Sequence, residues 1–242
     1  IRIKVKELDS NLGHFYLFDF SSINEIGNYH LEVDNRKTES FMIDFVCYDS
    51  SIWKSLNFLR SLRCGEDVEG VHSACHLNCR SVHPDGRTVP TFGGWHDAGD
   101  VSQFEICTAE MAHAICDLAL KNKADSFMFN RLLEEAKVGF NWLLRTRFGD
   151  GYRANAVGYR IWRKNTLDPT NTSIISKAEE GSFENFLSAA ALASGANLFK
   201  DLDIIYSDWC KRSAIEDFKF ACSEYLNKIY TVRWGEPIES QT

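Results

Sequence analysis

The segment Gly93-Gly94-Trp95-His96-Asp97-Ala98-Gly99-Asp100 is the most informative stretch of the chain. Its two aspartates flank Ala98 and Gly99, and a glycine allows a tight backbone and the close approach of a ligand. Two such carboxylates can hold one water molecule while one of them takes its proton, and like charges at short range drive their pKa values apart. An Asp-Gly turn or a surface calcium loop is the alternative, but calcium loops usually alternate three or more oxygen ligands.

Upstream of this segment, residues 1–46 have the alternating pattern of β-strands. Ile1, Ile3 and Val5 alternate with charged residues, and short strands are also expected over 15–20, 29–33 and 41–45. An immunoglobulin-like sandwich needs about seven strands. The pattern therefore predicts part of such a sandwich, and we expect the missing strands to lie before residue 1.

Downstream of residue 50 the period becomes helical. Ser182 is a predicted N-cap and Gly195 a predicted C-cap for one of the helices. The helices are expected over about 52–62, 104–121, 130–146, 183–194 and 203–229. The stretches 64–101 and 147–181 look irregular and are too long for idle connections, which favours a function for them. Residues 47–242 thus form an all-α body that resembles part of a larger helical array.

The composition is that of a globular protein, with 44% hydrophobic and 25% charged residues. The net charge is −7, and no Lys/Arg block is present that could follow a phosphate backbone, so we expect no nucleic-acid partner. No apolar run approaches the roughly 20 residues needed to span a bilayer. No signal peptide is visible, and the chain starts inside a strand pattern without Met, so we expect its true beginning to be missing.

Four residues around the central segment have the chemistry of a metal site: Cys64, Cys75, His76 and His96. Thiolate and imidazole suit tetrahedral Zn²⁺, and four protein ligands make a site structural rather than catalytic. Cys79 and His72 are spare candidates for the metal ligands. The alternatives to a metal site are reduced thiols or a Cys64–Cys75 disulfide, with His96 as a hydrogen-bond donor. Cys107 and Cys116 lie in an apolar helical stretch and are expected to be buried thiols.

The octet from Gly93 to Asp100 resembles the signature of glycoside hydrolase family 9, whose members are inverting cellulases with an (α/α)6 barrel. The resemblance continues in Arg63-Cys64-Gly65, in Cys75-His76, in Asn141-Trp142-Leu143-Leu144 and in the Ala-rich helix 187–194. It implies a mostly α protein, in which a partial immunoglobulin-like sandwich (1–46) precedes the N-terminal part of the barrel (47–242).

This resemblance implies an enzyme that cleaves β-1,4-glucosidic bonds in cellulose-type glucans or their oligosaccharides. Asp100 matches the general base and Asp97 the carboxylate that helps to hold the attacking water. Inversion also needs an acid, with the two carboxyls about 6.5–9.5 Å apart. The family takes this acid from a Glu in its C-terminal half, which no residue here matches. We therefore expect an N-terminal fragment, and a non-catalytic sugar-binding relative is the alternative.

The segments His83–Thr88 and Phe148–Arg153 resemble the exo-acting branch of the family. They imply an exo-β-glucosidase or glucosaminidase as a further alternative. Family members with the immunoglobulin-like module often bind zinc at the positions that match the Cys/His set, which implies a structural zinc and no organic cofactor. Secretion or export to the periplasm is the localisation that the family implies, whereas the oligomeric state stays open.

Aromatic side chains commonly line the clefts that bind sugars. Trp95 adjoins the two aspartates and is the predicted substrate-binding platform. Tyr152, Arg153 and Trp162 lie in the second irregular stretch and are weaker candidates for a cleft rim. Trp142, at helical spacing, is a predicted core residue.

Overall fold

The computed structural model describes residues 3–33, 35–98, 101–157 and 174–227. The chain divides into two compact units, Ile1–Ser55 and Leu56–Thr242. The boundary between them falls inside helix α1 (Asp49–Ser61), later than the boundary expected after residue 46.

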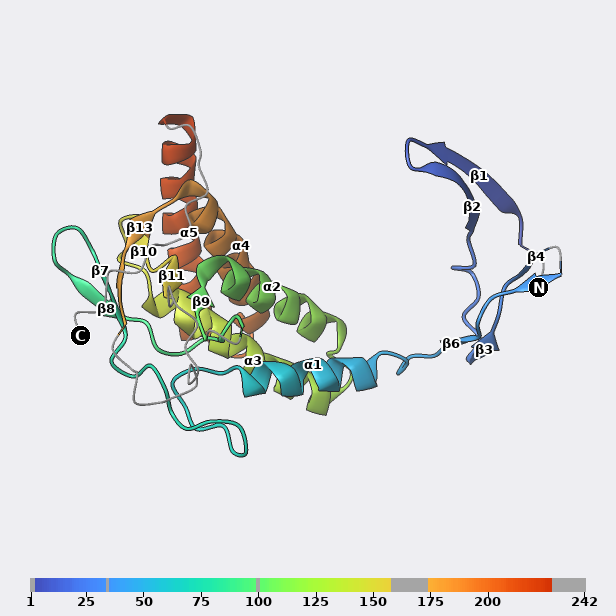
Figure 1. Cartoon of the computed structure of the whole chain (residues 1–242), viewed down its shortest axis with the longest axis horizontal. Helices are drawn as coiled ribbons and strands as arrows, with labels where there is room; N and C mark the ends of the chain where they lie inside the picture. The colour runs from blue at the N-terminus through green and yellow to red at the C-terminus, as the bar shows by residue number, and fades with distance from the viewer. Residues whose placement is uncertain (1–2, 34, 99–100, 158–173, 228–242) are drawn as a thin grey trace. The chain divides into compact units, whose positions relative to one another are not determined.

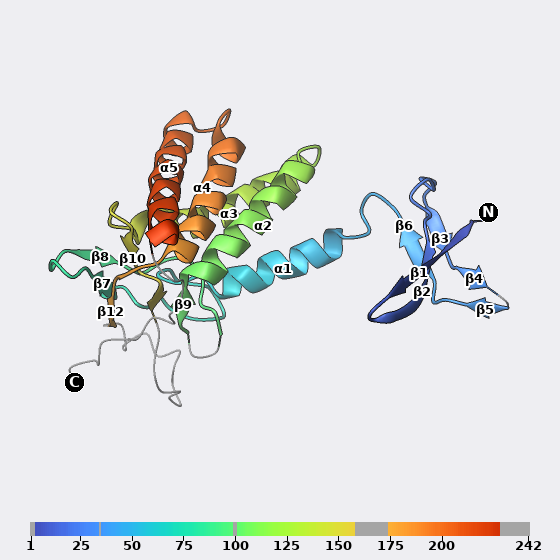
Figure 2. The same ribbon diagram turned by 90° about the horizontal axis from the view of Figure 1, so that it is seen from above.

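The first unit consists of short antiparallel strands. They pair in three two-stranded sheets, β1 with β2, β3 with β6 and β4 with β5 (Figure 1 and Figure 2). Their bounds are β1 Val5–Ser10, β2 Gly13–Phe18, β3 Gly27–Tyr29, β4 Glu32–Val33, β5 Arg36–Lys37 and β6 Phe41–Ile43. The strands expected over 15–20 and 41–45 are confirmed by β2 and β6, whereas the one expected over 29–33 is divided between β3 and β4.

The immunoglobulin-like sandwich is not confirmed by these strands. A sandwich buries the inner faces of two sheets against each other, but none of the described residues of Ile1–Ser55 is buried. Large apolar side chains such as Phe15, Leu17 and Met42 are exposed instead. The three small sheets of this unit therefore enclose no core of their own among the described residues.

The second unit is built on helices that form two hairpins. Connections of a few residues join α2 (Glu105–Lys121) to α3 (Ser126–Arg145), and α4 (Ser182–Phe199) to α5 (Ile204–Asn227). The two hairpins lie side by side, with α2 packed against α4 (Figure 2). This arrangement confirms the mostly α body and fits a partial helical barrel. Among the described helices, none is long and apolar enough to cross a bilayer.

Complementary side chains explain why these helices pack closely. Helix α2 buries small residues such as Ala112 and Ala119, which let a neighbouring helix approach. Helix α3 presents a stripe with helical spacing, in which Leu132, Ala136 and Phe140 are almost completely buried. Burying a side chain as large as leucine or phenylalanine contributes about 1.5–3 kcal/mol, so this stripe is a main source of the stability of the unit.

Three helix ends differ from the sequence prediction. Asp125 is the N-cap of α3, since its side chain accepts the N–H groups of Phe127 and Met128, so α3 begins before the expected residue 130. Gly181 rather than Ser182 is the N-cap of α4, which continues through Gly195 to Phe199. A Cβ on Gly195 would lie 3.1 Å from the Phe140 ring. Gly195 therefore makes room for a neighbour and does not end the helix.

The two stretches that look irregular in sequence contain short strands that join them. In one sheet, β7 (Arg80–Val82) pairs with β8 (Thr88–Pro90) and with β12 (Ile175–Lys177). Elsewhere β9 (Gln103–Phe104) pairs with β11 (Ala156–Val157), and β10 (Tyr152–Arg153) with β13 (Glu179–Glu180). Because β9 leads directly into α2 and β13 into α4, these pairs hold the loops at the N-terminal ends of both helices.

Candidate functional site

The loop that follows His96 leads into the start of α2 and carries an exposed aspartate. The Asp97 N–H donates to the Ser102 carbonyl at 2.7 Å, and the Val101 N–H donates to the Ala98 carbonyl at 2.9 Å. Val101 is buried and has a φ of +55°, while the Asp97 side chain lies in solvent. Gly99 and Asp100 lie outside the described residues, so the pairing of the two carboxylates stays a prediction.

The two glycines before Trp95 allow this segment to pack against α3. Gly94 has a φ of +68°, and a Cβ added there would lie 2.9 Å from the Trp142 ring. Trp142 is fully buried, as expected for a core residue, and its indole N–H donates to the Thr91 carbonyl at 2.9 Å. The Gln103 side chain donates to the Gly93 carbonyl and ties the segment to β9.

Trp95 is a core residue and not the exposed sugar platform that the sequence predicts. It is 5% exposed, and its indole N–H donates to Glu135 Oε1 at 2.8 Å. Its ring covers Gly139, where an added Cβ would lie 2.6 Å from Trp95 Cζ3. A sugar platform needs an open ring face, and here that face is taken by α3.

The structure brings together the four residues of the predicted metal site. Cys64, Cys75, His76 and His96 are all buried, and their ligand atoms lie within 4.8 Å of one another. Sγ of Cys64 is 3.4 Å from Nδ1 of His76, and Sγ of Cys75 is 3.4 Å from Nε2 of His96. The two sulfurs are 3.9 Å apart and the two nitrogens 3.3 Å apart.

These separations fit a tetrahedral zinc site. Zinc bonds of about 2.3 Å to sulfur and 2.0–2.1 Å to nitrogen place two sulfurs about 3.8 Å apart, two nitrogens about 3.4 Å apart, and a sulfur and a nitrogen about 3.6 Å apart. The four distances given above agree with these values to within a few tenths of an ångström. A disulfide has a bond of about 2.05 Å, so the alternative of a Cys64–Cys75 bridge does not describe this structure, in which both cysteines are free.

The backbone positions two of these ligands directly. The Cys64 N–H donates to the Gly94 carbonyl at 2.9 Å, and the His96 N–H donates to the Leu62 carbonyl at 2.8 Å. These bonds flank the antiparallel bridge between Arg63 and Trp95. A cation at this position would fix the backbone of His96, and with it the start of the loop that carries Asp97.

The other two ligands, Cys75 and His76, come from the loop before β7. His76 has a φ of +57°, which is uncommon for a residue with a side chain and is often found at functional sites. The contact with the Cys64 thiol lowers the pKa of Cys75. The spare candidate Cys79 lies outside the cluster, and its sulfur accepts the Ile174 N–H at 3.3 Å.

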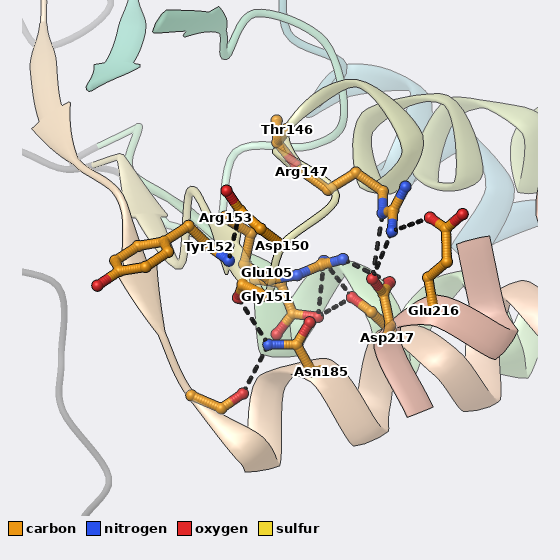
Figure 3. A network of polar contacts seen from close by, with 12 residues as sticks. Glu105, Thr146, Arg147, Asp150, Gly151, Tyr152, Arg153, Asn185, Glu216 and Asp217 are labelled. Carbon is orange, nitrogen blue, oxygen red and sulfur yellow. Dashed lines mark hydrogen bonds and ion pairs between the residues drawn. The ribbon is translucent and has the colours of Figure 1, made fainter. Parts of the chain in front are cut away.

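A buried polar network at the start of α2 is a feature that the sequence analysis missed (Figure 3). Arg153 is fully buried and not at a cleft rim as expected, and its Nη2 lies 2.7 Å from Asp217 Oδ2. Arg153 also donates to Ser188 Oγ, and Ser188 in turn donates to Glu105. Burial raises the pKa of Glu105 to about 7.

One of the two cysteines of α2 differs from the expectation. Cys116 is buried as expected, but Cys107, on the same helix, is exposed. Part-burial, and then the nearby Asp97 carboxylate, raises the pKa of Cys107 to about 11. The Cys107 thiol therefore lies close to the predicted water-holding carboxylate. Trp162, another weaker cleft candidate, lies outside the described residues.

The two motifs that resemble the exo-acting branch form one cluster. Arg87 binds Asp150 at 2.6 Å and lies over the Phe148 ring at 5.6 Å from its centroid. The rings of His83 and Tyr152 meet edge to face at 4.4 Å. The turn between β7 and β8 is therefore tied to the loop before β10, although the two motifs are far apart in sequence.

Comparison with known proteins places most of the chain in one family. The model of Glycosyl hydrolase family 9 matches residues 48–239. A cellodextrinase of Butyrivibrio fibrisolvens is 24% identical over an alignment of 255 residues. The alignment covers 89% of this chain and 45% of the relative. The chain therefore spans less than half the length of this relative.

Two solved structures share the fold. The crystal structure of a metagenome-derived glycoside hydrolase family 9 endoglucanase superposes with a TM-score of 0.66 at 19% identity, over 87% of this chain and 42% of that one. A Zn-binding triple mutant of the family 9 endoglucanase J30 superposes with a TM-score of 0.62 at 19% identity, over 95% of this chain and 46% of that one.

Proposed function

Because the chain belongs to glycosyl hydrolase family 9, we propose that it serves in the inverting hydrolysis of β-1,4-linked glucans or their oligosaccharides. The observation that carries the proposal is the exposed Asp97 carboxylate. The Asp97 N–H donates to the Ser102 carbonyl, and this hydrogen bond closes the loop. Asp97 directly follows His96 of the Cys/His cluster. A relative named cellodextrinase and a structural neighbour that is an endoglucanase support this class of substrate.

In the proposed mechanism Asp100 is the general base and Asp97 orients the attacking water. Two acceptors fix the position of one water molecule, and general-base catalysis by a positioned carboxylate contributes about 10²–10⁴-fold to the rate. The acid that protonates the leaving oxygen must stand about 6.5–9.5 Å from the base. We propose that this acid comes from the part of the family barrel that this chain does not match.

A structural zinc ion is part of the same proposal. Cys64, Cys75, His76 and His96 would hold it, and a closed four-ligand site supplies folding energy and no open position for a substrate. These ligands join the bridge at Arg63 and Trp95 to the loop before β7. In this way the ion would brace the chain immediately before Asp97 without taking part in the reaction.

An exo-acting glucosidase or glucosaminidase is the second candidate. It is favoured by the cluster of Arg87, Asp150, His83 and Tyr152, which joins the two motifs that resemble the exo-acting branch. Product analysis separates the candidates, because an exo-acting enzyme releases only monosaccharide while an endo-acting one releases mixed oligosaccharides.

The experiment compares Asp100→Asn, Asp97→Asn and the control Asp208→Asn, which replaces an exposed aspartate of α5. Each substitution is made in a form of this protein that hydrolyses glucan. We expect Asp100→Asn to lower kcat by about 10²–10⁴-fold, Asp97→Asn to lower it less, and the control to leave it unchanged. Retained turnover by Asp100→Asn removes this residue from the mechanism. Sugar binding without hydrolysis by the unaltered protein indicates the third reading, a non-catalytic sugar-binding relative.

A further inference from the structure

Glu135 on α3 is a fully buried carboxylate that contacts both chain segments leading to the metal site. Its Oε2 lies 2.7 Å from Arg63 Nη2, and its Oε1 lies 3.2 Å from Arg63 Nε. Oε1 also accepts the Trp95 indole N–H at 2.8 Å. One carboxylate thus binds two side chains that are distant from each other in sequence.

Both partners of Glu135 adjoin a residue of the Cys/His cluster. Arg63 precedes Cys64, and Trp95 precedes His96. Arg63 and Trp95 also face each other across the antiparallel bridge. Glu135 therefore fixes the two segments from the side of α3, while the backbone bonds hold them to each other.

We propose that Glu135 is a positioning residue for zinc, which holds Cys64 and His96 at the spacing the ion requires. The inference rests on the zinc site proposed above. Polar groups that orient metal ligands typically change metal affinity by about 10–100-fold when they are replaced. Glu135 acts through the neighbours of the ligands, because two donors on one carboxylate restrict how far the segments can move apart.

A role in general stability alone predicts a different behaviour. If Glu135 only supported the helical unit, its loss would lower the Tm of the zinc-loaded and the zinc-free protein equally. As a positioning residue it contributes most when the ligands surround the ion, so its loss also narrows the difference in Tm between the two forms. Zinc affinity and this difference are therefore the informative measurements.

The neighbouring Glu134 provides a matched control. Its Oε1 lies 3.3 Å from the same Arg63 Nη2, but its side chain is 54% exposed, whereas that of Glu135 is completely buried. Glu135→Gln and Glu134→Gln make the same chemical change one residue apart. We expect zinc, titrated against a chromophoric chelator, to bind Glu135→Gln about 10–100-fold more weakly than the unaltered chain, and Glu134→Gln with unchanged affinity.

The milder variant Trp95→Phe tests the role of Glu135 if Glu135→Gln does not fold. It keeps an aromatic ring and removes only the indole N–H that donates to Glu135, and we expect a smaller loss of zinc affinity. If Glu135→Gln folds and binds zinc with unchanged affinity, the role of Glu135 is overturned and the zinc site stands. If Glu135→Gln does not fold, unchanged zinc affinity in Trp95→Phe has the same meaning. An unaltered chain that binds no zinc overturns the zinc site itself.

Discussion

Arg153 and Asp217 form an ion pair that is closed to solvent. The Arg153 Nη2 lies 2.7 Å from Asp217 Oδ2, and the two side chains are 0% and 2% exposed. The other oxygen of Asp217 binds Arg147 at 2.9 Å. Two arginines that follow α3 are thus joined to α5 through one aspartate (Figure 3), and the removal of that aspartate would leave the buried Arg153 guanidinium with only the more distant Glu105 carboxylate, at 3.5 Å, as a charged neighbour among the described residues.

We predict that Asp217→Asn lowers the free energy of unfolding by about 3–5 kcal/mol, the usual cost of removing one partner of a buried pair. Glu216→Gln is the control, because Glu216 pairs with Arg147 at 2.7 Å but has a side chain that is 54% exposed. Exposed pairs contribute about 0–1 kcal/mol. Denaturant titration measures both variants, and equal losses would contradict the argument from burial.

The buried carboxylate of Glu105 should make stability depend on pH. Its pKa is raised from 4.5 to about 7, mainly by burial, so the folded state holds this proton more tightly than the unfolded state. The contribution of Glu105 to stability therefore falls as the pH rises from about 4.5 through about 7, and stays constant above.

Glu105→Gln removes this titration, so its stability relative to the unaltered chain should increase between pH 5 and pH 8. The increase is on the order of 3 kcal/mol if the whole pKa difference is expressed. Denaturant titration at both pH values measures it. The control Glu110→Gln, exposed on the same helix, should show no such increase, and a constant difference for Glu105→Gln would show that the carboxyl is not titrating there.

Gly139→Ala tests the burial of Trp95 against α3. The new Cβ would lie 2.6 Å from Trp95 Cζ3 and 2.8 Å from Ala112 Cβ. Overpacking of this kind costs about 1–3 kcal/mol and should outweigh the gain of about 1 kcal/mol in helix propensity.

Gly195→Ala is the matched control, since it makes the same change inside α4. Its Cβ would meet the Phe140 ring at 3.1 Å, where a small shift of the ring relieves the contact. Thermal unfolding should show a clearly lower Tm for Gly139→Ala than for Gly195→Ala. A stabilised Gly139→Ala would mean that the Trp95 ring is not packed there.

Cys107 should react slowly with iodoacetamide even though it is exposed. Part-burial and the Asp97 carboxylate raise its pKa to about 11, and the thiolate is the reactive form. Relative to a thiol with an ordinary pKa of about 8.5, we expect alkylation at pH 7.5 to be slower by roughly 100-fold.

Asp97→Asn should accelerate this alkylation, because it removes the negative charge beside the thiol. Peptide mapping by mass spectrometry follows Cys107 separately from the other cysteines. Asp117→Asn, an exposed aspartate of the same helix, is the control and should not change the rate. An unaltered rate in Asp97→Asn would show that its carboxylate does not act on Cys107.

Features that depend on residue type and local spacing could be predicted from the sequence. Helical periodicity predicted α2 and α5 to within a few residues, because an apolar pattern of period 3.6 is a property of the segment alone. The ligand types predicted the cluster of Cys64, Cys75, His76 and His96, which the structure brings together. Only cysteine supplies a thiolate and only histidine an imidazole, and both are preferred ligands of zinc, so the set stands out in the sequence.

Which side chains are enclosed, and by which elements, could be seen only in the folded chain. Trp95 is covered by α3, and Arg153 is enclosed by Glu105, Ser188 and Asp217, all of them distant in sequence. The burial of a side chain depends on the elements that pack against it. The hydrophobic period along one segment does not specify those elements. From the sequence alone, Trp95 and Arg153 therefore fitted a sugar cleft as well as a core.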